Sequence, residues 1–204
     1  MMKIAPLALR APFLAAPFLA GLLLAGCATP SFVSPVEVTR FAAPQARLAS
    51  GTISVTPAQG TDSATPEYAA FAGAVQRELT ALGYSVVATG GAQVAQLSLT
   101  QSVSPPERRS PVSVGGGGSV GTYGSGVGLG IGLNLNPGRG EAVETRIALF
   151  IRPAAGGSNL WEGRASMSAS ANSEYNTADA TAARMAAALL HGFPGTSGET
   201  ISVE

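Results

Sequence analysis

The alternation of apolar and polar positions along the chain predicts a series of short strands. It is clearest over 143–151 and 161–169, where every second residue is apolar or small, and the glycine-containing turn 153–159 between them predicts a hairpin. Weaker alternation predicts four more strands, at 36–41, 52–56, 84–88 and 94–103.

Two other segments repeat apolar residues at helical spacing. Thr65 is suited to cap a first helix, which has Pro66 in its first turn and ends at Gly83. A second helix is predicted over about 177–192, with Asn176 as its N-cap. The apolar positions are Phe71, Val75, Leu79 and Leu82 in the first helix, and Ala178, Ala182, Met185 and Leu189 in the second.

Runs of strands interrupted by two helices predict an α+β fold. We expect a mostly antiparallel sheet with both helices packed on one face, plus a glycine-rich insertion. The predicted single domain covers 37–195 and includes the insertion at 111–139, and residues 196–204 are expected to form a C-terminal tail.

The first 27 residues have the organisation of a bacterial lipoprotein signal. Lys3 and Arg10 accompany about 14 apolar or small positions, the length of a secretory signal and too short for a membrane-spanning helix. The run Leu24-Ala25-Gly26-Cys27 resembles the lipobox that signal peptidase cuts before a diacylated cysteine. The alternative is a core cysteine after an uncleaved apolar segment.

The lipobox predicts how the chain is processed and where it is located. Residues 1–26 would be removed as the signal peptide, and residues 27–36 would form a tether that begins at Cys27, the acylated first residue. Two or three acyl chains, of which one is typically palmitate, anchor a protein firmly without crossing the membrane. Ala28 replaces the aspartate that retains lipoproteins in the inner membrane of enteric-type bacteria. We therefore expect an outer-membrane lipoprotein facing the periplasm of a Gram-negative bacterium.

Composition limits the classes of function. Cleavage would leave 178 residues with ten arginines, twelve acidic residues and no lysine, a balance that argues against nucleic-acid binding. With its one thiol acylated and one histidine, the mature chain offers neither a disulfide nor a metal site rich in His and Cys. We predict no cofactor and no metal.

The candidate catalytic residues do not form a recognisable active site. His191 lies near a helix C-terminus, where helix capping or solvent exposure explains it, and Asp179 is about 18 Å away along the same helix. Glu141 and Glu144 would lie on opposite faces of an extended strand. No Gly-x-Ser-x-Gly motif occurs. We therefore predict that the protein is not an enzyme.

The glycine-rich insertion is the most unusual part of the mature chain. Its segment from Gly126 alternates glycine with apolar residues, so that Val127, Leu129 and Ile131 would share one face of an extended strand. One interpretation is a flexible loop that folds back over its own domain. The other is a contact surface that adds a strand to a partner or lies against the membrane.

Trp161 is the chain's single tryptophan, on a strongly alternating strand. Such a residue is usually part of the core, and the alternative is a contact that stacks on a ligand. We retain Trp161 with Val127, Leu129 and Ile131 as candidate ligand or partner contacts.

The carboxyl-terminal half resembles a known family. The run Asn159-Leu160-Trp161-Glu162-Gly163-Arg164-Ala165, and the alanine-rich helix that ends Leu189-Leu190-His191-Gly192-Phe193-Pro194, resemble the bacterial lipoproteins catalogued as domain of unknown function 4136. The resemblance covers most of 35–195. Family members often carry acidic residues entering the strand after the first helix, where this chain has Ala92-Gln93-Val94-Ala95-Gln96. The resemblance implies an envelope lipoprotein with an α+β domain and no established activity.

Together these observations predict a lipid-anchored, non-enzymatic lipoprotein that serves as a structural or accessory module of the cell envelope. Its expected partners are the membrane, through acylated Cys27, and an envelope protein. The alternative is a binding module for a small apolar or lipid-like ligand held between sheet and helices.

Overall fold

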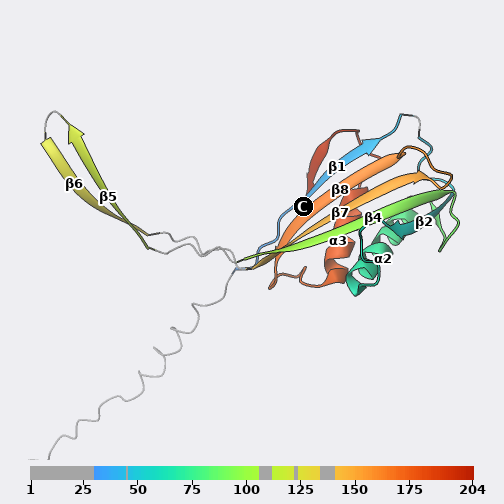
Figure 1. The fold of residues 1–204 in the computed structure, drawn as a ribbon, viewed down its shortest axis with the longest axis horizontal. Helices are drawn as coiled ribbons and strands as arrows, with labels where there is room; N and C mark the ends of the chain where they lie inside the picture. Colours follow the sequence, from blue (N-terminus) through green and yellow to red (C-terminus); the bar gives the residue numbers. More distant parts are fainter. Residues whose placement is uncertain (1–29, 45, 106–111, 122–123, 134–140) are drawn as a thin grey trace, which may run out of the picture.

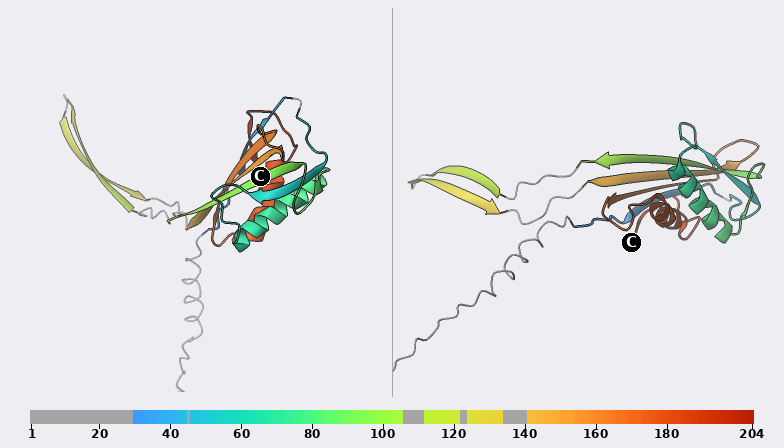
Figure 2. Two further views of the ribbon diagram at one scale, coloured as in Figure 1. Left: turned by 45° about the vertical axis from the view of Figure 1, so that its right-hand side comes forward. Right: turned by 90° about the horizontal axis from the view of Figure 1, so that it is seen from below.

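The computed structural model describes residues 30–44, 46–105, 112–121, 124–133 and 141–204, with only the backbone course described for the third and fourth ranges. The main body is a seven-stranded sheet with two helices over one face (Figure 1; Figure 2). This arrangement confirms the predicted α+β fold.

The sheet order is β3-β2-β4-β7-β8-β1-β9. Strand β2 pairs in parallel with β3 and β4, and the other neighbours are antiparallel. The elements, in chain order, are β1 (Val36–Ala42), β2 (Thr52–Pro57), α2 (Pro66–Ala81), β3 (Ser85–Val86), β4 (Gln93–Ser104), β5 (Val112–Gly121), β6 (Gly124–Leu133), β7 (Ala142–Pro153), β8 (Trp161–Ser170), α3 (Ala178–Leu190) and β9 (Thr200–Val203).

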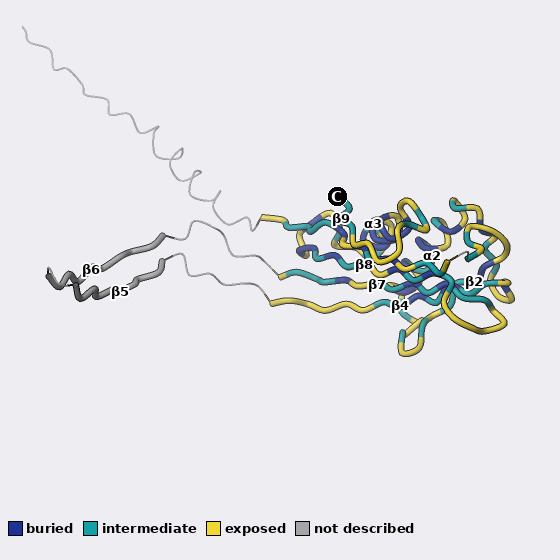
Figure 3. The backbone as a smooth tube through the Cα atoms, turned by 90° about the horizontal axis from the view of Figure 1, so that it is seen from above, coloured by how far each residue is buried: buried dark blue, intermediate teal, exposed yellow. Residues whose placement is uncertain are grey.

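The predicted hairpin is formed by β7 and β8. Its alternation is confirmed, because the odd-numbered side chains are buried toward the helices. They run from Thr145 to Ile151 in β7 and from Trp161 to Ala169 in β8. Figure 3 shows the resulting contrast between a buried interior and exposed loops. The predicted strand at 84–88 shortens to β3, which has two residues.

The two helices begin at side-chain caps. Thr65 Oγ1 accepts the Tyr68 N–H at 3.1 Å, as predicted. The second cap prediction was wrong by one residue, because Thr177, and not Asn176, accepts the Ala180 N–H. Asn and Thr are both good caps, so the sequence does not separate neighbouring candidates, whereas the extended backbone of Thr177 fixes the start of α3.

A single apolar core fills the space between the sheet and helices. Trp161 is fully buried, its indole N–H donates to the Pro194 carbonyl at 2.9 Å, and its ring lies 5.0 Å from that of Phe193. The other large, fully buried side chains are Phe71, Ile53, Leu79, Leu97, Leu149, Ile151, Met185, Leu189, Val36, Val38 and Val75. Helix packing therefore covers the central part of β4, β7 and β8, the long strands of the seven-stranded sheet.

Residues 196–204 do not form a separate tail. They include β9, which pairs antiparallel with β1 from Val36↔Val203 to Thr39↔Thr200 and forms one edge of the sheet. The prediction was wrong because a four-residue strand carries too little alternation to be recognised, and its position depends on the free edge of β1.

The predicted tether 27–36 is partly built into the domain. Phe32 and Ser170 exchange two hydrogen bonds of 2.8 and 2.9 Å, and the Ser34 N–H donates to the Ser168 carbonyl at 2.8 Å. The chain thus already runs along β8 before β1 begins. Pro30 and Pro35 suggested a linker, but the backbone groups beside Pro35 still find partners.

Within the glycine-rich insertion, β5 and β6 pair antiparallel as a separate two-stranded sheet. The register places Val127 opposite Gly118, Leu129 opposite Gly116 and Ile131 opposite Val114. In the chain the hairpin lies between β4 and β7, whose last pair is Ser104↔Ala142. Among the described residues, no helix has the length and apolar character to span a membrane.

Candidate functional site

One end of the sheet brings together three features that are far apart in the sequence. The described chain starts there at Pro30, β4 ends there at Ser104, and β7 starts there at Ala142. Ser104 pairs with Ala142, Ala142 pairs with Ser170, and Ser170 bonds Phe32, so these residues form a row across the sheet. We call this end, defined by that row, the anchor end.

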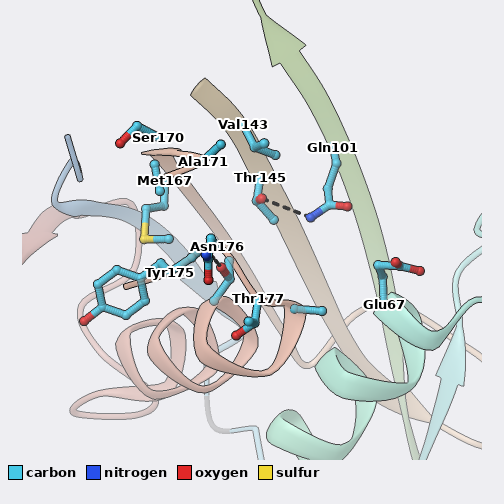
Figure 4. Close-up of a pocket in the computed structure, with 13 residues that line it drawn as sticks. Glu67, Gln101, Val143, Thr145, Met167, Ser170, Ala171, Tyr175, Asn176 and Thr177 are labelled. Atoms are coloured by element: carbon cyan, nitrogen blue, oxygen red, sulfur yellow. Dashed lines mark hydrogen bonds between the residues drawn. The ribbon is translucent and has the colours of Figure 1, made fainter. Parts of the chain in front are cut away.

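The anchor end contains a cavity with a volume of about 360 Å³. It lies where α2 and α3 begin, above β4, β7 and β8 (Figure 4). Its lining residues are Glu67, Gln101, Val143, Thr145, Met167, Ala169, Ser170, Ala171, Tyr175, Asn176, Thr177, Ala178 and Thr181.

The cavity exists because the helices are shorter than the strands they cover. Toward the anchor end, the sheet continues past the first residues of both helices, so side chains on its helix face lose their cover. Val103 shows the effect most strongly, since it continues the face of buried Leu97 but is 61% exposed. Alternation along the predicted strand 94–103 puts Leu97 and Val103 on one face, but the sequence does not show where the covering helices begin.

Several polar groups of the cavity already have partners. The Gln101 amide N–H donates to Thr145 Oγ1 at 3.3 Å, and the Thr181 hydroxyl donates to the Tyr175 carbonyl at 2.8 Å. Ser170 Oγ accepts the Phe32 N–H and donates to Asn172. The cavity thus combines hydrogen-bonded hydroxyl and amide groups with the carboxylate of Glu67 and with apolar Val143 and Met167.

The predicted site residues fall into different parts of the molecule. Leu24, Ala25, Gly26 and Cys27 lie outside the described residues. Val127, Leu129 and Ile131 lie in β6, where only the backbone is described.

Trp161 is a core residue and not a ligand contact. It is fully buried beneath Phe193 and lines none of the described cavities, so its candidacy as a contact is withdrawn. The cavity residues Gln101, Thr145 and Met167 replace it as candidates. These three residues could not be recognised from the sequence, because a side chain on the inner face of a strand can be assigned to the core or to a cavity only when the covering helix is placed.

His191 and Glu144, which were considered as candidate catalytic residues, make contacts that belong to the fold. His191 is exposed at the C-cap of α3, as predicted, and its carbonyl accepts a hydrogen bond from the buried Arg40 at 2.5 Å. Burial lowers the pKa of Arg40 from its ordinary value, and the nearby Glu199 acts in the opposite direction. Glu144 pairs with Arg146 on the solvent face. Among the described residues, no three acidic, histidine or cysteine side chains gather as metal ligands.

Comparisons with known proteins give structural likeness only. No protein-family model and no curated protein matches this chain. A PDZ domain protein from Parabacteroides distasonis aligns with a TM-score of 0.49 and 13% identity, over 84% of this chain and 38% of its own length. A PelC dodecamer from Paraburkholderia phytofirmans aligns with a TM-score of 0.42 and 11% identity, over 76% of this chain and 94% of its own. This chain therefore spans well under half of the PDZ domain protein.

Proposed function

We propose that the protein is a lipid-anchored lipoprotein of the outer membrane, facing the periplasm, and that it serves as a non-enzymatic structural or accessory interaction module. The observation that carries this proposal is the anchor end. The path of Phe32 to Ser34 along β8 brings the start of the domain to the end where β4 and β7 connect to the insertion. Membership of the lipoprotein family that the sequence resembles is part of the same proposal.

The short distance from Cys27 to the sheet gives the anchor a mechanical role. Phe32 follows Cys27 by five residue steps, which a fully extended chain spans in at most about 18 Å. Phe32 is fixed to Ser170 by two hydrogen bonds. An acylated Cys27 would therefore hold the anchor end close to the lipid head groups. The cavity and the insertion would then be presented near the membrane, and the opposite end would face the periplasm.

The test of the anchor is Cys27→Ala in the full-length protein. We expect the parent to incorporate labelled palmitate and to sediment with the outer membrane, and the variant to remain an unlabelled precursor. Ala28→Asp is the matched control, because it should keep the label and shift the protein toward the inner membrane in an enteric host. Mature-length Cys27→Ala protein in the outer-membrane fraction would contradict the proposal.

The partner in the envelope can be sought by crosslinking in cells, with the full chain compared to a variant that lacks residues 113–138. Reproducible capture of one envelope protein that depends on the insertion supports an adaptor role. Equal capture by both chains would instead assign the contact to the seven-stranded domain.

The cavity at the anchor end supports a second candidate function, the binding of a small lipid-like ligand. Its mixture of Met167 and Val143 with hydroxyl groups suits an amphipathic molecule. A short-chain phospholipid should raise the unfolding temperature of the full chain if it binds the folded state. Ala171→Phe at the cavity should abolish the shift, and Ala183→Phe on the exposed side of α3 should not. No shift at any lipid concentration would exclude this function.

A further inference from the structure

Strand β4 has a free edge near the anchor end. On one side it pairs with β7 along its whole length, from Gln93 to Ser104. On the other side β2 reaches only to Pro57, opposite Leu97, and the next residue, Ala58, donates its N–H to the Leu97 carbonyl at 2.8 Å. Beyond that point no described residue pairs with this side of β4, so the edge is free from Leu99 to Ser104 (Figure 2).

The hydrogen bonds identify which backbone groups point outward. Ala58 bonds the Leu97 carbonyl, so the odd-numbered residues of β4 direct their N–H and C=O groups away from β7. The Leu160–Ile151 bond confirms the pattern, because it directs the odd-numbered residues of β7 toward β8 and the even-numbered ones toward β4. Leu99, Gln101 and Val103 therefore offer three donors and three acceptors to an incoming strand.

This edge lacks the features that usually prevent strand pairing. Natural sheets protect edges with charged side chains, proline, bulges or very short strands. The other edge strands follow that rule by length, since β3 has two residues and β9 has four. β4 contains no charged residue in all its twelve positions, and proline comes only at Pro105. From Thr100 onward its residues are exposed, Val103 most clearly.

We propose that the free edge of β4 binds the same edge of a second copy of this chain, antiparallel and with the two-fold axis at Gln101. The two-fold axis stands perpendicular to the sheet, so the helices of both copies lie on the same side. In this register Gln101 faces Gln101, Leu99 faces Val103 and Thr100 faces Ser102. The contact is isologous, and it joins two seven-stranded sheets into one.

The residues of this edge are self-complementary in the proposed register. Each odd-numbered residue faces another odd-numbered residue in a hydrogen-bonded pair. These pairs use the free backbone donors and acceptors of both strands. The exposed Val103 gains an apolar neighbour in Leu99 of the second copy, and Thr100 meets Ser102 on the solvent face. Gln101 keeps its bond to Thr145 and still has a second N–H and a carbonyl oxygen for its counterpart.

The structure also limits the length of the contact. Ala58 occupies the place beside Ser98, so the pairing is limited to Leu99–Val103, and Ser104 of each copy, the last residue of β4, must bend away from Ala58 of the other. A pairing of five residues is weak for two free proteins. This inference rests on the proposed lipid anchor, because copies confined to one membrane surface meet at a high effective concentration.

The test is a cysteine scan of positions 99–103 in the full-length protein in cells, followed by a short bismaleimide crosslinker. If Cys27 is acylated, the introduced cysteine is the only free thiol. Maleimide labelling of the parent chain, which has no introduced cysteine, tests the anchor separately. Reaction of the parent with maleimide would contradict acylation of Cys27. The cysteine scan would then be repeated in the Cys27→Ser background, so that the crosslinks still report on β4. Gln96→Cys, on the covered part of β4, is the matched control.

The proposal expects a dimer of twice the chain's mass, strongest at Gln101→Cys, weaker at the flanking positions and lost at Gln96→Cys. The Leu99→Cys/Val103→Cys double variant should crosslink more than either single variant, since these residues face each other. Absence of dimer at all five positions would overturn the proposal, as would a dominant product whose mass shows a different protein.

Two substitutions test the edge without disturbing the sheet. Gln101→Pro removes an outward N–H and no backbone bond to β7, although the side-chain bond to Thr145 is lost with it, and Val103→Lys adds a charge to the edge. Both should abolish the crosslinked dimer in the Leu99→Cys background, and Gln96→Lys in the same strand should retain it. Persistence of the dimer in Val103→Lys and Gln101→Pro would show that another surface makes the contact.

Discussion

At the residue scale, Gly163 is required by the packing of Trp161. A Cβ atom on Gly163 would lie 2.2 Å from Cη2 of the Trp161 ring and 2.8 Å from Cδ1 of Leu189. Strand β8 therefore has a gap in its side chains that the outer edge of the indole ring fills, and Trp161 and Gly163 form one packing unit that the sequence presents as two independent positions.

Gly163→Ala is expected to destabilise the fold by about 1–3 kcal/mol through overpacking. The fluorescence of Trp161 during urea unfolding measures it directly. Gly73→Ala is the matched control, because a Cβ at that position of α2 would meet nothing closer than 3.7 Å and should stabilise the helix by about 0.5–1 kcal/mol. Equal effects of the two substitutions would contradict this account.

The buried tyrosines make stability sensitive to alkaline pH. Burial raises the pKa of Tyr84 above the ordinary 10.0, against a smaller opposite effect from a hydrogen bond with the Ala49 backbone, and burial also raises the pKa of Tyr68. In the unfolded chain these phenols ionise first. Their contribution to stability is thus complete below about pH 10 and is lost as the pH rises through the folded-state pKa values.

We expect the free energy of unfolding to fall as the pH rises above about 10, and to fall less steeply in the Tyr68→Phe/Tyr84→Phe double variant. Urea midpoints at several pH values measure the slope. An identical slope in parent and variant would assign the alkaline loss to other groups.

At the element scale, β9 shows how a short strand acquires its place from its neighbours. It covers the edge of β1, and its residues Ile201 and Val203 pack against the core. The preceding Glu199 also lies near the buried Arg40, which bonds the end of α3. The last residues of the chain thus link the sheet edge to the helix terminus.

Removal of residues 199–204 is expected to lower the free energy of unfolding by about 2 kcal/mol, from the loss of two half-buried apolar side chains. Chemical denaturation checks the value. A chain that lacks Glu204 alone should behave as the parent. If the longer truncation is also without effect, β9 does not contribute to the stability of the sheet.

At the scale of the whole molecule, the insertion is expected to be thermodynamically separate from the seven-stranded domain. Its strands pair with each other, and Ser104 and Ala142 already face one another at its base. An Asn-Gly turn placed between Ser104 and Ala142 should therefore close the β4–β7 hairpin.

Replacing residues 105–141 by that turn should change the free energy of unfolding of the domain by no more than about 0.5 kcal/mol. Circular dichroism during denaturation measures this change. The same turn in place of residues 153–159 serves as a control for the effect of shortening a loop. A large loss of stability would mean that the insertion contributes contacts to the domain.

Local structure follows from the sequence alone: the β7–β8 hairpin, the apolar stripe of α2 and the Thr65 cap result from alternation, helical spacing and side-chain chemistry within a few residues. The sequence could not place features that depend on distant parts of the chain. The role of β9 depends on the open edge of β1, and the cavity and the exposure of Val103 depend on where two helices begin over a longer sheet. Trp161 left two interpretations open until Phe193 and Pro194 were seen to cover it. Hydrophobic periodicity reports which face of an element is apolar, but only tertiary packing decides how far along the element that face is covered.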